Sequence, residues 1–144
     1  MEIILSTNDN YKKVANLSKW TSDAGNVSHW VNIRTFWFNG EEWIPTKNGV
    51  MLMSAEFWEI LTPLNERKAW PLNNSNSVEL SDPTEKLDEK ELRTIRLRKN
   101  EKYSFMMDII LTTDKGESVV SLTIGEIGKL ISNKRKIYNY FKEN

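Results

Sequence analysis

Hydrophobic and polar residues alternate along several stretches of this chain, and a period of two predicts β-strands rather than helices. The alternation is clearest over residues 30–38. If this stretch is a strand, one face carries Val31, Ile33, Thr35 and Trp37, and the other carries Trp30, Asn32, Arg34, Phe36 and Phe38. Arg34 and Trp37 then fall on opposite faces, unless the strand bulges or twists sharply between them.

Two further strands are predicted in the first half. Residues 11–20 form a candidate strand, although its lysines and asparagines make the pattern uneven. Residues 42–53 return as a strand after Asn39-Gly40, a favoured hairpin dipeptide. Pro45 and Gly49 predict a bend in this returning strand.

The second half repeats this order of elements. Residues 93–98 alternate, with Ile95 and Leu97 on one face. A long β-rich run covers residues 103–113, turns at residues 114–116 and returns over residues 118–122.

A helix is predicted after the last strand of each half. The first begins at Ser54 and reaches about residue 61, where Pro63 limits or kinks it. The second begins with a capping box in which Thr123 and Glu126 satisfy each other's open backbone donors. Its apolar stripe consists of Ile127, Leu130, Ile131, Ile137, Tyr138 and Phe141.

The expected fold is therefore α+β, with two βββα units around a pseudo-twofold axis. Val-Met-Leu precedes the first helix and Val-Ser-Leu the second, which favours a duplication. We place the first unit at residues 1–70, an acidic polar linker at 71–91 and a divergent second unit at 92–144. The alternative is one irregular α+β domain whose halves are alike by chance.

The charge of the chain is unevenly distributed, although the net charge is zero. Residues 1–78 have a net charge of −1, residues 79–92 of −4, and residues 93–144 of +5. A basic final third behind an acidic spacer indicates an acidic partner such as nucleic acid, whereas an unevenly charged but inert surface is the alternative.

The composition argues against several classes of protein. The 144 residues suit one compact domain, and no apolar run is long enough for a membrane helix or a secretory signal. The chain has no cysteine and one histidine, which leaves few ways to build a nucleophile–base pair or a zinc site. We therefore expect no catalytic residue, metal or cofactor, and an intracellular location: cytoplasmic or nuclear, or on the nucleoid. The many Asn, Lys and Ile residues are typical of an AT-rich genome, as in a phage or another virus.

Aromatic residues are concentrated in the first half. Four of the six tryptophans, Trp30, Trp37, Trp43 and Trp58, lie within or beside residues 31–58. Rings and cations on a sheet surface are how proteins hold unstacked bases. Trp58 is expected in the core, and Trp20 and Trp70 at the ends of the unit; Trp37 is left open between the core and a stacking role.

Several short motifs then resemble a known family. These are Ile33-Arg34-Thr35-Phe36-Trp37, Gly40-Glu41, residues 45–52 (PTKNGVML), and a helix with an early tryptophan. In order and spacing they resemble the single-stranded DNA-binding domain of the transcriptional coactivator positive cofactor four, over about residues 19–61. The resemblance implies a strongly curved antiparallel sheet, backed by a helix, that binds single-stranded or melted DNA as a dimer. Two such repeats in one chain would be similar to the plant Whirly proteins.

The resemblance also implies which residues contact DNA. Arg34 and Trp37 match DNA-contacting positions of the family's second strand, and Lys47 a basic position of its bent third strand. Ile44 and Asn48 depart from the pattern, because the family has basic residues there. The second half lacks the tryptophan but has five cations within ten residues: Arg93, Arg96, Arg98, Lys99 and Lys102. We infer that the first half supplies stacking rings and the second neutralises phosphates.

The sequence thus predicts a single-stranded DNA-binding protein with little sequence preference, acting in replication, recombination or transcription. The candidate nucleic-acid-binding residues are Lys19, Arg34, Phe36, Trp37, Trp43, Lys47, Arg96 and Arg98. RNA binding by the same fold is one alternative, because a stacking sheet does not separate the two sugars. A viral factor that binds a host polymerase is the other. Expected partners are single-stranded DNA, RNA, transcription or replication proteins, or a second copy of the chain, and no membrane.

Overall fold

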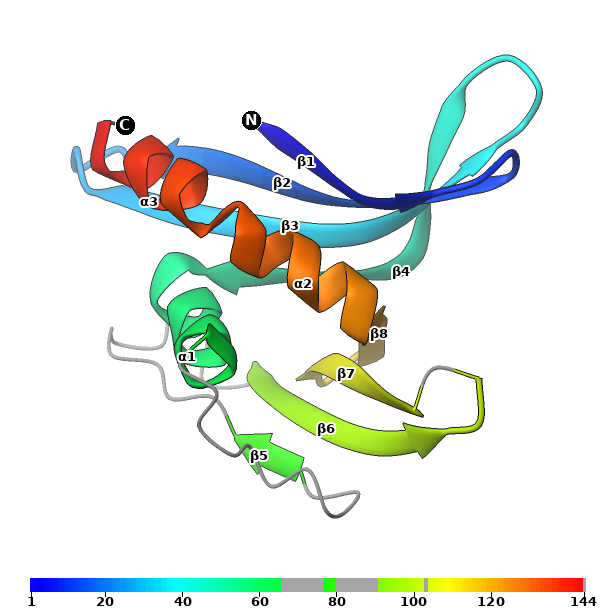
Figure 1. Ribbon diagram of the computed structural model, residues 1–144. Coiled ribbons are helices and arrows are strands. Elements are labelled where there is room, and N and C mark those ends of the chain that lie inside the picture. Colours follow the sequence, from blue (N-terminus) through cyan, green and yellow to red (C-terminus); the bar gives the residue numbers. More distant parts are fainter. Residues whose placement is uncertain (66–76, 80–90, 103, 144) are drawn as a thin grey trace.

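The structure, a computed structural model, describes residues 1–65, 77–79, 91–102 and 104–143. In these residues the chain is an α+β fold with two antiparallel four-stranded sheets (Figure 1). Strands β1 to β4 form the N-terminal sheet and β5 to β8 the C-terminal sheet, each in sequence order. A helix follows the last strand of each sheet. The predicted α+β class with antiparallel sheets is confirmed.

The N-terminal sheet is a meander of four strands, β1 (Glu2–Thr7), β2 (Tyr11–Thr21), β3 (Val27–Phe38) and β4 (Trp43–Met53). Strand β1 was not predicted, because the apolar run Ile3-Ile4-Leu5 conceals the alternation. Its burial nevertheless alternates: Ile3 and Leu5 are buried, whereas Ile4 is 49% exposed. The predicted number of three strands per unit is therefore wrong for this sheet.

The alternation in β3 is unbroken, because β2 and β3 pair residue by residue from Thr21 opposite Val27 to Tyr11 opposite Trp37. The buried Val31 and Ile33 define the inner face of the N-terminal sheet, and the opposite face is its outer face.

Strand β4 bends as predicted. Gly49 lies opposite Arg34 and Pro45 lies opposite Phe36, so β4 takes four steps where β3 takes two. Residues 46–48 are the bulge that takes up the difference.

The C-terminal sheet consists of β5 (Ser77–Glu79), β6 (Leu92–Asn100), β7 (Ser104–Thr113) and β8 (Gly116–Thr123). Strand β5 lies inside the segment 71–91 that was predicted to be a linker, and it pairs with β6. A three-residue strand is too short to show a period, which is why the sequence pattern missed it. Residues 71–76 and 80–90 of that segment, which include most of its acidic residues, lie outside the described residues.

The helices begin where the sequence predicted but differ in extent. Helix α1 (Ser54–Asn65) continues past Pro63, and the C-terminal helix is split into α2 (Ile124–Ser132) and α3 (Lys134–Glu143). The capping box of Thr123 and Glu126 is confirmed. At the split, the side-chain amide of Asn133 donates to the Lys129 carbonyl at 2.7 Å, and such bonds compete with the helical pattern.

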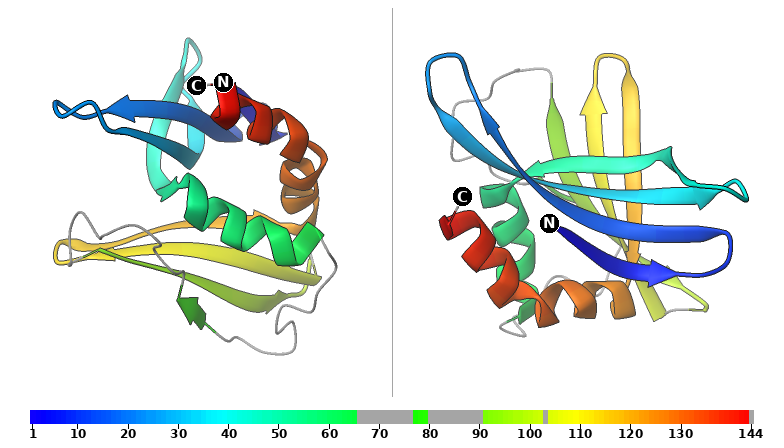
Figure 2. Two further views of the ribbon diagram at one scale, coloured as in Figure 1. Left: turned by 90° about the vertical axis from the view of Figure 1, so that its left-hand side faces the viewer. Right: turned by 90° about the horizontal axis from the view of Figure 1, so that it is seen from above.

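One hydrophobic core joins the two sheets and the helices. Helix α1 lies between the sheets, and α2 and α3 flank them (Figure 2). Buried side chains from every layer belong to one cluster, among them Ile33, Leu52, Phe57, Ile109 and Ile137. The stripe predicted for the C-terminal helices therefore covers a core to which both halves contribute, but Tyr138, which was assigned to it, is 56% exposed.

The strand registers of the two sheets can be superimposed row by row. In the N-terminal sheet Leu17, Val31 and Leu52 lie opposite one another across β2, β3 and β4; in the C-terminal sheet the corresponding row is Leu97, Met107 and Leu122. All six side chains are buried, and in both sheets the helix begins two residues after the last leucine.

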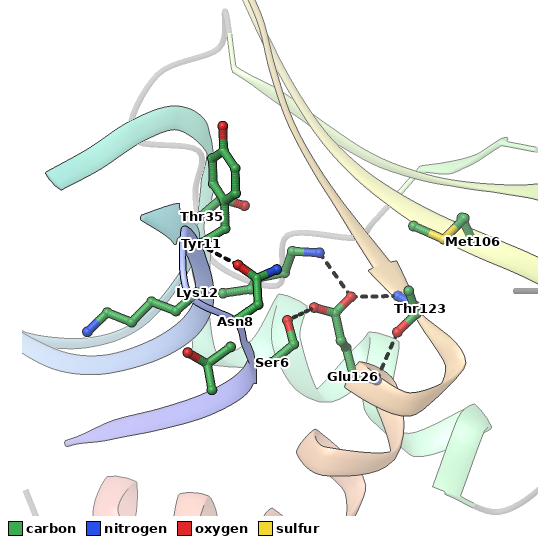
Figure 3. A pocket seen from close by; sticks show the side chains of 10 residues that line it. Ser6, Asn8, Tyr11, Lys12, Thr35, Met106, Thr123 and Glu126 are labelled. Atoms are coloured by element: carbon green, nitrogen blue, oxygen red, sulfur yellow. Dashed lines mark hydrogen bonds and ion pairs between the residues drawn. The ribbon is translucent and has the colours of Figure 1, made fainter. Parts of the chain in front are cut away.

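A largely buried ion pair connects β2 to α2. Lys13 Nζ lies 2.9 Å from Glu126 Oε1, and their side chains are 17% and 6% exposed. Lys13 also donates to the Ser121 carbonyl. The Ser6 hydroxyl donates to the second oxygen of Glu126 at 2.6 Å (Figure 3). Burial alone would raise the pKa of Glu126, but the hydrogen bonds from Ser6, Thr123 and Lys13 outweigh it and hold the pKa below its ordinary value.

A second ion pair connects β6 to α1 in the same way. Arg93 Nε lies 3.5 Å from Glu56 Oε1 and donates to the Met51 carbonyl at 2.8 Å. Glu56 also accepts the Met53 backbone N–H at 2.8 Å, as Glu126 accepts that of Thr123 at 2.9 Å.

The two ion pairs occupy matching positions. Lys13 lies four residues before Leu17, and Arg93 four residues before Leu97. Each half thus supplies a cation to the glutamate of the other half's helix.

Candidate nucleic-acid interface

A groove lies where the outer face of the N-terminal sheet meets the C-terminal sheet. Its volume is about 620 Å³. Strands β2, β3 and β4 form one wall, and residues before and within the C-terminal sheet form the other. We call it the Trp30 groove; its lining residues are Ser18, Lys19, Trp20, Trp30, Arg34, Gly49, Met51, Glu91, Arg93, Leu111 and Ser118.

Two tryptophan rings supply the apolar surface of the Trp30 groove. Trp20 is 56% exposed, and Trp30 is half-buried. The indole N–H of Trp30 donates to Ser28 Oγ at 2.9 Å, which holds the ring in place. The guanidinium of Arg93 lies over the Trp30 ring, 5.9 Å from its centroid. The ring of Trp30 is therefore fixed, whereas most of Trp20 is available to a ligand.

Arg34 lies flat across β4, and the absence of a side chain at Gly49 makes room for it. A Cβ at position 49 would lie 2.5 Å from Arg34 Cζ and 2.8 Å from Arg34 Cγ. The guanidinium donates to the Thr46 carbonyl at 2.6 Å, within the β4 bulge. Gly49 thus allows Arg34 to pack closely against β4. Positive φ angles occur instead at Gly25, Gly40 and Gly116, which lie in or directly beside hairpin turns.

The charged residues of the Trp30 groove are mostly positive. Lys19, Arg34 and Arg93 line it, against the single carboxylate of Glu91. Arg93 is bound to Glu91 at 3.2 Å and to Glu56. Lys19 and Arg34 are thus the cations best placed to meet an anionic ligand.

Further along the same outer face, a second aromatic cluster surrounds Lys12. Its ammonium lies 5.6 Å from the centroid of the Phe36 ring and 5.0 Å from that of Trp43. Trp43 also packs against Phe38, with 5.1 Å between ring centroids. The predicted residues Phe36 and Trp43 therefore share a face with Arg34, but lie outside the Trp30 groove.

Two residues from the family resemblance are not brought to the Trp30 groove. Trp37 is 43% exposed and lies on the inner face, opposite the also exposed Tyr11. Lys47 is exposed in the β4 bulge. The period-two assignment of Arg34 and Trp37 to opposite faces is confirmed.

Arg96 and Arg98 lie on the C-terminal sheet and do not line the groove. Both contact Asp108 Oδ2, at 2.9 Å each, and the Ser121 hydroxyl donates to Asp108 Oδ1 at 2.6 Å. Their neighbours Ile95 and Leu97 are buried, so the arginines occupy the other face of β6, as the alternation predicted. The structure therefore does not bring these two arginines to the groove that Arg34 lines.

The sequence reasoning missed Trp20, Trp30 and Arg93 as members of the site. Trp30 could have been found, since the alternation already placed it on the face of Arg34. Trp20 was expected to pack at the end of the unit, and its exposure shows that expectation to be wrong. Arg93 was noted only as one of several cations, and its distance of 42 positions from Met51 leaves no local signal.

Within the described residues, no helix has the length and apolar character to cross a membrane, and no three His, Cys, Asp or Glu side chains gather as a metal site. Searches with this sequence found no matching protein-family model and no matching curated protein.

Proposed function

We propose that this protein binds single-stranded DNA in the Trp30 groove, with little sequence preference, in replication, recombination or transcription. The observation that carries the proposal is the exposed Trp20 ring beside Trp30, Lys19 and Arg34 in one groove. Rings stack on any base and cations neutralise phosphates, so this combination suits unpaired strands.

The proposal extends along the outer face of the sheet. Lys12, Phe36 and Trp43 continue the sequence of rings and cations from Arg34 toward the tip of the β3–β4 hairpin. Residues 30 to 36 of an extended strand span about 20 Å. A strand of several nucleotides would thus run along β3.

We further propose that the chain is an internal duplication with a Whirly-like, pseudo-twofold layout. The matched register rows and the exchanged ion pairs Lys13–Glu126 and Arg93–Glu56 support it. Each proposed unit has four strands followed by a helix.

The test measures binding of oligo-dT by tryptophan fluorescence and by anisotropy of a labelled strand. We expect quenching, and affinity that falls steeply as salt rises, because counterions are released. Trp20→Ala should weaken binding about tenfold, since losing one stacking ring costs on the order of 1–3 kcal/mol. Trp37→Ala is the matched control: its ring is also exposed but lies on the inner face, so affinity should not change.

Three outcomes bear on the proposal. Absence of both quenching and anisotropy change at low salt refutes binding of single-stranded DNA. Equal losses in the Trp20 and Trp37 variants refute the groove as the site. Tighter binding of the matching RNA or of duplex DNA would reassign the ligand while retaining the site.

A further inference from the structure

By strand register, the outer face of the C-terminal sheet corresponds to the wall of the Trp30 groove that β2, β3 and β4 form. In the N-terminal sheet, Ser18, Trp30 and Met51 each adjoin a member of the buried row and line the groove. Their counterparts beside the other buried row are Arg98, Met106 and Ser121. A methionine thus replaces the stacking ring, and an arginine replaces a serine.

At two further corresponding positions, charged residues in the C-terminal sheet replace asparagines of the N-terminal sheet and form a charged cluster around β7. Asp108 takes the position of Asn32, and Arg96 that of Asn16. Asp108 is 1% exposed and accepts hydrogen bonds from both arginines and Ser121. Its burial raises its pKa, but the hydrogen bonds from Arg98, Ser121 and Arg96 lower it further than burial raises it, so the carboxylate is ionised at neutral pH.

Asp108 positions two guanidinium groups without neutralising both. The side chains of Arg96 and Arg98 are 44% and 39% exposed, and together with Asp108 they keep one positive charge. Each guanidinium has five N–H donors and uses only one or two on Asp108. The remaining donors can meet a phosphate, for which arginine is the preferred partner.

We propose that Arg96 and Arg98 form a second nucleic-acid site, which binds the phosphodiester backbone and leaves the bases unstacked. A strand held there is distinct from the one in the Trp30 groove, so one molecule binds two strand segments. This inference rests on the proposed function for the class of ligand, but it uses different residues.

The two sites can be read separately, because the described tryptophans belong to the N-terminal sheet and α1. The part of the quenching that Trp20→Ala removes therefore reports the Trp30 groove, whereas the anisotropy of a labelled strand reports both sites. A short strand of about six nucleotides fills one site, and a strand of about thirty can reach both.

The test variant is Arg96→Gln/Arg98→Gln/Asp108→Asn, which removes the cations without leaving a buried charge unpaired. Lys136→Gln, an exposed change on α3 with the same loss of net charge, is the control. With the long strand, the triple variant should lose about tenfold in affinity, and the slope of log affinity against log salt should fall by about 1.4, for two phosphates. Quenching by the short strand should not change.

The reverse change gives an independent test. Asp108→Asn alone frees both arginines from their counter-charge, and it should tighten binding of the long strand and steepen its salt dependence. A triple variant that behaves like Lys136→Gln, or an Asp108→Asn variant with unchanged affinity and a wild-type melting temperature, overturns the second site and leaves the groove untouched. Arginine-dependent anisotropy without quenching would instead retain this site and refute the groove.

Discussion

At the scale of single residues, Gly49 determines how Arg34 is presented. The arginine crosses β4 at the one position where no Cβ stands in its way, and its guanidinium reaches the Thr46 carbonyl in the bulge. The bulge and the glycine therefore act together: the bulge supplies the Thr46 carbonyl as acceptor, and Gly49 leaves space for the Arg34 side chain.

Gly49→Ala should displace Arg34 while retaining the fold, because position 49 does not have a positive φ. A misplaced guanidinium should lose its charge-assisted hydrogen bond to a phosphate of the strand. Binding of oligo-dT should then weaken about tenfold, since such bonds contribute about 1.5 kcal/mol. Anisotropy titration measures it. Gly128→Ala, at an exposed helical site with open space around it, should leave the affinity unchanged and raise the melting temperature slightly. An unchanged affinity in Gly49→Ala would show that Arg34 does not contact the strand.

Alternation along β3 was sufficient to assign residues to faces, and Arg34 and Trp37 lie as it predicted. It could not say which rings stay exposed. Trp20 and Trp58 were both expected to be packed, but only Trp58 is covered, by packing against the core. Exposure depends on segments distant in the chain, so local periodicity carries no information about it.

At the scale of elements, a glutamate in the first turn of the helix that follows each sheet also forms an ion pair with the other half of the chain. Glu126 completes the capping box of α2 and also holds Lys13 of β2. The capping box could be predicted, because its residues are three positions apart. The ion pair could not, because 113 positions separate its partners.

The ion pair of Lys13 and Glu126 makes the free energy of unfolding depend on pH. The folded-state pKa of Glu126 lies below its ordinary value, so its contribution is complete above the unfolded pKa of about 4.3 and is lost as pH falls through the folded value. Glu126→Gln should therefore lower stability at pH 7, by about 3 kcal/mol for a broken buried pair, and by much less near pH 3. Urea unfolding at both pH values measures the difference. Glu117→Gln, an exposed change on β8, should show neither effect; an equal loss at both pH values in Glu126→Gln would contradict the assignment.

At the scale of the whole molecule, neither half is complete without the other. Each half contributes side chains to the same core, and each supplies a cation to a buried glutamate of the other. The sequence indicated this dependence through the repeated order of elements. It did not reveal β1 and β5, whose short or uneven patterns fall below what a period of two can detect.

A fragment of residues 1–72 should therefore be unstable or dimeric. Alone it exposes the apolar face of α1 and removes the ion-pair partners of Lys13 and Glu56, which lie on α2 and β6. In a dimer of fragments, a second copy could cover the face, and its Glu56, which matches Glu126, could pair with Lys13. Circular dichroism and light scattering measure folding and mass. Adding a fragment of residues 73–144 should restore a monomeric-sized heterodimer with a cooperative melt. A stable, monomeric 1–72 fragment with full-length affinity for oligo-dT would show instead that the N-terminal sheet is a self-sufficient domain and that the exchanged ion pairs only fasten a second domain to it.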